Sequence, residues 1–143
     1  MDELTWYNDL ELKLNRPLLV VAFRGLFDAS GSATSAVRWL VDRSDTEILG
    51  EINPETFFDF TQERPTVSFD DNGLRKLTWP QNLIVAIRNP GEKRDLVAVA
   101  GVEPHLRWKS FSRAMVEVAQ QQQVELVVTL GSMIGMTPHS RPP

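Results

Sequence analysis

A run of six consecutive apolar residues, Leu18–Phe23, constrains the fold of this chain more than any other feature. The run is too short for a helix, and its valines favour extended backbone, so it is typical of a strand covered on both faces. Similar runs occur at Leu83–Ile87, Leu96–Ala100 and Leu126–Leu130. The sequence therefore predicts a largely buried sheet, with helices needed on both of its faces.

Two segments have the spacing of amphipathic helices, with apolar residues three and four positions apart. The first stripe consists of Ala33, Ala36, Val37, Leu40 and Val41, and Ser32 is its expected N-cap. The second lies within Trp108–Gln122 and consists of Phe111, Ala114, Met115, Val118 and Ala119. Each stripe gives its helix one face that can cover the sheet.

The middle of the chain indicates antiparallel pairing. A strand is expected at Glu47–Ile52, and the Asn72-Gly73 pair predicts a hairpin between Thr66–Phe69 and Leu74–Trp79. The link between the runs at 83–87 and 96–100 is too short for a helical crossover, so these strands are antiparallel or lie apart. The predicted fold class is α/β, with a mixed, largely buried sheet flanked by helices.

The length of 143 residues corresponds to one domain. Residues 1–16 are expected to form an N-terminal arm or edge strand, and residues 17–143 an α/β domain. The last apolar run leads into a glycine-containing loop, with no following helix to cover the sheet. We therefore expect that the α/β domain lacks a C-terminal half that a longer protein would supply.

Composition excludes several classes of protein. The chain has no cysteine, which excludes disulfides and thiolate metal sites and suits a reducing compartment. Its net charge of −4 argues against binding to nucleic acid through phosphates. The acidic start lacks the pattern of a signal peptide, and no apolar run is long enough to span a bilayer. We expect a cytoplasmic protein that binds neither membrane nor nucleic acid.

Ligands of open α/β sheets bind where loops leave the carboxyl ends of the strands. Three loops here follow apolar runs, namely 24–31, 101–107 and 131–141. If their strands are parallel neighbours, these loops share one rim of the sheet. The candidate ligand-binding residues on that rim are Gly25, Asp28, Ser32, Gly101, Glu103, Arg107, Gly131, Ser132 and His139.

Each loop has a catalytic and a structural interpretation. The candidate catalytic residues are Asp28, Glu103, His105, Arg107, His139 and Arg141. Glu103 could orient His105 as a general base while Arg107 binds an anion, or Glu103 and Arg107 could form an ion pair that holds the loop. Asp28 could accept local amide hydrogen bonds, and His139 could bond to a neighbouring loop.

Known catalytic and metal-binding spacings are missing. The segment around Ser132 lacks the Gly-x-Ser-x-Gly pattern of a nucleophile elbow, because the second glycine is displaced by one position. The two histidines and the glutamate do not have the spacing of a zinc site, so no metal or cofactor is predicted. The aromatic segment Phe57–Phe60, with Arg64 nearby, is interpreted as a lid over the core or as an exposed protein-binding surface.

Five segments in order resemble the bacterial branch of the proteasome-assembly-chaperone type-two family. They are Leu19–Ser32, Phe57–Phe60 with Arg64-Pro65, Trp79-Pro80, Gly101–Pro104 with Arg107-Trp108, and Leu130-Gly131 with Pro138–Pro142. The family's usual tryptophan in the first loop is Leu26 here. The resemblance covers most of the chain from Pro17 to Pro142 and implies a fold related to the nucleoside phosphorylase/hydrolase architecture.

The resemblance also implies a full-length protein about twice as long and a role in protein assembly. We favour a protein-interaction or assembly-chaperone-like function, with protein partners and self-association into a homo-oligomer. The alternative is a phosphorylase- or hydrolase-type enzyme that acts on a small nucleoside-like or anionic ligand. In that case Arg107 and Ser32 would hold a phosphate, and Glu103 would be the acid or base.

Overall fold

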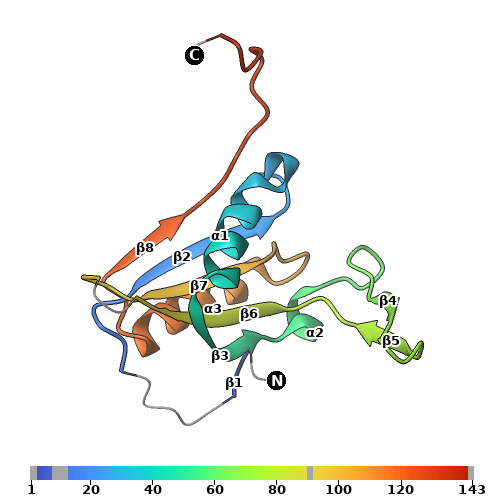
Figure 1. The fold of residues 1–143 in the computed structure, drawn as a ribbon, viewed down its shortest axis with the longest axis horizontal. Coiled ribbons are helices and arrows are strands. Elements are labelled where there is room, and N and C mark those ends of the chain that lie inside the picture. Colours follow the sequence, from blue (N-terminus) through green and yellow to red (C-terminus); the bar gives the residue numbers. More distant parts are fainter. Residues whose placement is uncertain (1–2, 8–12, 90–91, 142–143) are drawn as a thin grey trace.

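The structure is a computed structural model that describes residues 3–7, 13–89 and 92–141. A six-stranded mixed sheet forms its centre, and a separate two-stranded hairpin projects from it (Figure 1). The elements in chain order are β1 Leu4–Trp6, β2 Leu18–Arg24, α1 Ser32–Asp42, β3 Asp45–Ile52, α2 Pro54–Phe57, β4 Thr66–Phe69, β5 Arg75–Thr78, β6 Asn82–Arg88, β7 Leu96–Val102, α3 Trp108–Gln121 and β8 Leu126–Thr129.

The strand order in the large sheet is β1-β3-β6-β7-β2-β8. β2 is parallel to both β7 and β8, whereas β6 is antiparallel to β3 and to β7. The mixed sheet is therefore confirmed, and β6 and β7 are antiparallel neighbours. β1, at one edge, is antiparallel to β3, so the part of residues 1–16 that is described includes an edge strand.

Helices cover both faces of the sheet because side chains of each central strand alternate between the faces. On β2, Leu19 and Val21 pack in a core cluster with Phe111 of α3, whereas Val20 and Ala22 pack with Val37 of α1. Figure 1 shows the two helices on opposite sides of the sheet. The continuous apolar run thus supplies both cores at once.

Buried hydrogen bonds between the Asn82 side chain and the Val102 main chain lie at the end of the β6–β7 pair. The Asn82 side chain accepts a hydrogen bond from the Val102 amide at 2.8 Å and donates to the Val102 carbonyl at 2.9 Å. Gly101 leaves room for this contact, since a Cβ on it would lie 1.9 Å from the Asn82 Oδ1 atom. The asparagine side chain therefore replaces the main-chain partner that β6 would otherwise supply.

The predicted hairpin is present as β4 and β5, but its turn is longer than a two-residue turn. Gly73 has φ +75°, and the Asp70 carboxylate accepts hydrogen bonds from the amides of Asn72 and Leu74. The aromatic segment before the hairpin is part of the core, because Phe57 and Phe58 are buried. The lid interpretation of this segment is therefore the one that agrees with the structure.

The expectation that the last strand is buried is wrong. β8 pairs with β2 on one side, and no described strand pairs with its other side. Leu126 is 55% exposed and Val127 is 49% exposed. β8 is thus an open edge strand, and its apolar composition is not matched by a covering element within the described residues.

Candidate functional site

The three predicted loops leave one rim of the sheet. β7, β2 and β8 are adjacent parallel strands, so their carboxyl ends lie side by side, as expected from the sequence. β7 extends to Val102, so Gly101 belongs to the strand and the second loop begins at Glu103. The rim therefore brings the first loop close to Glu103 on one side and to Gly131 and Ser132 on the other.

Main-chain and hydroxyl bonds join the first and third loops. The Ser132 amide donates to the Phe27 carbonyl at 2.8 Å, and the Ala29 amide donates to the Ser132 carbonyl at 3.2 Å. The hydroxyls of Ser32 and Ser132 lie 2.8 Å apart, and each lies within 3.1 Å of the Ala29 carbonyl. Both serines thus form part of the connection between the loops.

Asp28 is the acceptor at the N-terminus of α1. It is buried, and its carboxylate accepts hydrogen bonds from the Ala33 amide at 2.8 Å, the Thr34 amide at 3.3 Å and the Thr34 hydroxyl at 2.6 Å. The Thr34 hydroxyl, followed by the two amides, lowers the pKa of Asp28 against the opposing effect of burial.

The expectation that Ser32 is the N-cap of α1 is wrong. The N-cap is Gly31, and Ser32 is the first helical residue. Ser30 and Gly31 both have left-handed backbone, with φ values of 57° and 66°, which brings the more distant Asp28 over the helix end. Its charge also interacts favourably with the helix dipole there.

Glu103 lies against the first loop. Its Oε2 atom accepts a hydrogen bond from the Leu26 amide at 3.4 Å. A Cβ on Gly25 would lie 2.0 Å from the Glu103 Cδ atom, so the glycine is needed for this close approach. Glu103 therefore connects the second loop to the first.

The alternative ion pair between Glu103 and Arg107 is absent. Arg107 instead lies 3.5 Å from the Glu3 carboxylate, with φ 53° at the position just before α3. The two residues lie at the ends of a loop segment, and Arg107 has left-handed backbone. Their four-residue separation therefore does not bring them together as it would within a helix.

His105 holds the segment after α2. Its Nδ1 atom accepts a hydrogen bond from the Asp59 amide at 3.1 Å, and its ring packs edge-on to Phe58 with centroids 5.8 Å apart. An imidazole that accepts at Nδ1 carries its proton on Nε2. Hydrogen bonds from Thr61, followed by one from Gln62, lower the pKa of Asp59.

The third loop continues into a tail that extends away from the sheet (Figure 1). His139 and Arg141 are exposed on it, and no hydrogen bond connects the His139 side chain to another described residue. The expected bond from His139 to a neighbouring loop is therefore not present. The apolar residues of the same loop are also exposed, with Met133 at 75% and Ile134 at 85%.

The candidate catalytic side chains do not converge. Glu103 contacts the first loop, His105 contacts the Asp59 segment and Arg107 contacts Glu3, so these three side chains bond to three different parts of the chain. In the part of the chain that the structure describes, no group of three or more histidine, aspartate or glutamate residues is placed to hold a metal ion. Nor does any described helix have the length and apolar character needed to cross a membrane.

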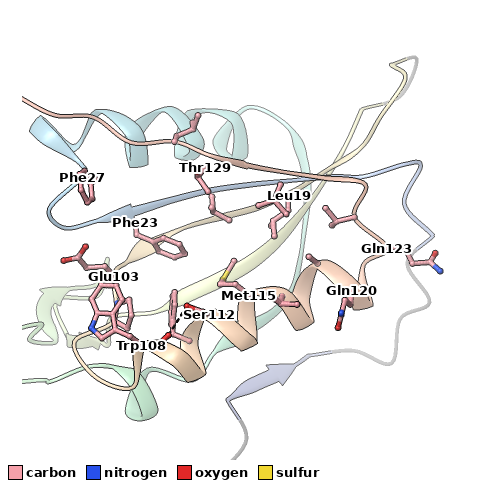
Figure 2. Close-up of a pocket in the computed structure, with 18 residues that line it drawn as sticks. Leu19, Phe23, Phe27, Glu103, Trp108, Ser112, Met115, Gln120, Gln123 and Thr129 are labelled. Carbon is pink, nitrogen blue, oxygen red and sulfur yellow. Dashed lines mark hydrogen bonds between the residues drawn. The ribbon is translucent and has the colours of Figure 1, made fainter.

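An apolar groove of about 690 Å³ lies between α3 and the β2–β8 edge of the sheet (Figure 2). Its lining includes Leu19 and Phe23 of β2, Met115 of α3 and Val127 of β8. Glu103 is the only charged residue among those that line it. The sequence did not predict this groove, because the same residues have the pattern of a closed core.

Comparisons with known proteins decide the family. The sequence model of the PAC2 family matches residues 22–143. The chain belongs to the PAC2 family. This confirms the resemblance to the assembly-chaperone family that the sequence motifs indicated. None of the curated proteins compared with this PAC2 chain matches it.

Several solved structures are similar to this PAC2 chain. A PAC2 family protein from Streptomyces avermitilis is 44% identical, with a TM-score of 0.81 over 88% of this chain and 54% of its own. A proteasome-assembly chaperone homologue from Mycobacterium tuberculosis is 37% identical, with a TM-score of 0.79 over 87% of this chain and 53% of its own.

A protein of unknown function from Corynebacterium glutamicum is 26% identical, with a TM-score of 0.84 over 99% of this chain and 54% of its own. The PAC2 chain therefore spans about half the length of these three relatives.

Proposed function

We propose that this chain is part of a protein-binding, assembly-chaperone-like protein that contacts proteasome subunits. One observation carries the proposal. At the rim where a small ligand would bind, large apolar side chains are open to solvent, with Leu26 at 78% and Ile134 at 85% exposed. The polar side chains of the rim are engaged within the fold, because Asp28 bonds to the start of α1 and Glu103 and Ser132 bond to the first loop. Exposed apolar side chains on loops favour contact with another protein.

The description of a relative supports one class of partner. The M. tuberculosis relative is described as a proteasome-assembly chaperone homologue, which supports proteasome subunits as the class of partner. We also propose that the protein acts in the cytoplasm and self-associates. The net charge of −4 supports partners other than nucleic acid.

The test measures proteasome assembly with the natural full-length protein. Purified proteasome α- and β-subunits of the same organism are mixed with and without it, and peptidase activity and native gels follow core-particle formation. We expect faster assembly, and we expect Leu26→Ser with Ile134→Ser to abolish the effect. Ile48→Ser, which changes an exposed apolar residue on β3, is the matched control. Equal assembly rates with and without the protein would contradict the proposal.

We also propose that the α/β domain of residues 17–143 is completed by a further polypeptide that covers the groove and the β8 edge. Three relatives are about twice as long as this chain, so their chains include a segment of sufficient length. β8 offers that segment an unpaired edge, and the groove beside it is apolar. A strand that pairs with β8 would satisfy the free main-chain groups of the edge.

Amide hydrogen exchange tests this arrangement. The amides of Leu126–Thr129 are compared between a fragment of residues 1–143 and the natural full-length protein. Covering the edge should slow the exchange of amides that point away from β2 by at least about tenfold. Exchange in β6, which is central in both proteins, is the control. Equal exchange of the β8 amides in the two proteins would exclude a covering segment.

A further inference from the structure

The β4–β5 hairpin has one apolar face and one polar face. Val67 pairs with Leu77, and Phe69 pairs with Arg75, so these four side chains lie on the same face. The opposite face consists of Thr66, Ser68, Lys76 and Thr78. Val67, Phe69 and Leu77, called here the hairpin face, are 63%, 70% and 51% exposed.

This arrangement leaves apolar surface without a covering layer. Figure 1 shows the hairpin projecting away from the six-stranded sheet, so the sheet does not cover the hairpin face. The base of the hairpin is fixed by Trp79, whose ring packs edge-on against Phe60 with centroids 5.0 Å apart. An isolated two-stranded hairpin is at best marginally stable in water, so a partner on the hairpin face would stabilise it.

The charges of the hairpin indicate what that partner is. Its tip has two acidic residues, Asp70 and Asp71, and its base has the exposed Arg64. Two hairpins stacked face to face with tip over base would place the acidic tip of each beside the arginine of the other. Tip over tip would instead place the acidic residues of the two tips beside each other. The charge pattern is therefore complementary to itself under a two-fold axis.

We propose that the hairpin face binds the hairpin face of a second copy of this chain, with tip over base about a two-fold axis. This inference rests on the proposed function, in which the protein self-associates, and it assigns that association to a particular surface. The surface is separate from the rim residues Leu26 and Ile134. Substitutions on the two surfaces therefore distinguish failure of this proposal from failure of the proposed function.

The first test measures the association of the natural full-length protein by sedimentation equilibrium over a range of concentrations. Phe69→Ser should raise the dissociation constant about a hundredfold, because the substitution removes an apolar contact from each of the two copies related by the two-fold axis. Lys76→Ser changes the polar face of the same hairpin and should leave the constant unchanged. Both residues are exposed, so circular dichroism should show that both variants keep the fold.

The second test reverses charges. Arg64→Glu or Asp71→Lys alone should weaken association about tenfold, since each change affects two exposed ion pairs per dimer. The double variant should return to within about threefold of the wild type, because the tip-over-base arrangement then restores both pairs with opposite polarity. Damage to the fold would not be reversed in this way.

Other outcomes would overturn the proposal. A wild-type protein that stays monomeric at roughly 100 µM would exclude a useful self-contact. Association that is unaffected by Phe69→Ser would place the contact on another surface. A monomer whose Phe69→Ser variant fails in the proteasome assembly assay would show that the hairpin binds a different protein. Failure of the double charge variant to recover would exclude the tip-over-base arrangement.

Discussion

Asp28 provides the sharpest test of how the rim is built, because its carboxylate accepts two backbone amides and a hydroxyl at the start of α1. Replacing it with alanine leaves the Ala33 and Thr34 amides buried without this acceptor. Loss of a helix cap costs about 0.5–2 kcal/mol, and an unsatisfied buried donor costs about 1–3 kcal/mol. These values describe the same bonds and do not add. We expect Asp28→Ala to lower the free energy of unfolding by about 2.5 kcal/mol.

Urea unfolding followed by circular dichroism measures this change. With a denaturant slope of about 2 kcal/mol/M, the unfolding midpoint should fall by about 1.2 M. Asp28→Asn keeps an oxygen for the amides but loses the charge, so its loss should be smaller, about 1 kcal/mol. Asp42→Ala, at the opposite end of α1, removes an acidic group from the unfavourable end of the helix dipole and is the control.

The stabilisation of the fold by the Asp28 carboxylate should decrease at low pH. The folded state lowers the pKa of Asp28, so the unfolded chain binds its proton more readily. The stabilisation by this carboxylate is complete above the unfolded pKa of about 3.9 and is lost as the pH falls through the folded value. The difference between wild type and Asp28→Asn should therefore shrink below about pH 4. A midpoint change under about 0.3 M for Asp28→Ala, or a constant difference for Asp28→Asn down to pH 3, would refute the capping argument.

Two further substitutions test the connections on either side of the rim. Asn82→Leu removes both hydrogen bonds to the Val102 main chain. It should lower the free energy of unfolding by about 3 kcal/mol, which corresponds to a fall of about 9 °C in the thermal midpoint. Gln81→Leu, at the exposed neighbouring position, is the control and should change the midpoint by less than about 2 °C. His105→Phe keeps an aromatic ring but removes the acceptor of the Asp59 amide, which should cost about 1 kcal/mol in urea unfolding and shift the Asp59 amide resonance. An unchanged resonance would show that the histidine does not hold this segment.

Much of the fold follows from local patterns. The apolar runs at 18–23, 83–87 and 96–100 match strands, because a central strand needs apolar residues on both faces. The run at 126–130 has the same composition but lies at an open edge. Burial of a strand depends on the elements that pack beside it, and the composition of the strand does not specify those elements. The pattern therefore predicted the strand and misjudged its exposure.

The rim was also predictable only in part. The order of apolar runs was enough to place three loops together, since parallel neighbours end at one edge. The contacts between polar groups on the rim depend on left-handed backbone at Ser30 and Arg107, and neither residue is a glycine. These conformations bring Asp28 to the helix end and separate Arg107 from Glu103. Sequence spacing alone gives no sign of them, because most residues other than glycine avoid positive φ.

Three apolar surfaces are uncovered in the described residues: the β8 edge, the hairpin face and the rim. They differ in the kind of contact that a partner would make with them. Within the described residues, the β8 edge presents unpaired main-chain groups beside an apolar groove, which suits the strand that we propose to pair with it. The hairpin face has its backbone already paired within the hairpin and needs only side-chain contact, which suits a second copy that can dissociate. The rim presents Leu26 and Ile134 on loops, where side chains can adapt to the surface of the proposed proteasome partner. The proposed assembly-chaperone-like function would use contacts of these three kinds, and the three surfaces lie on different elements of the chain.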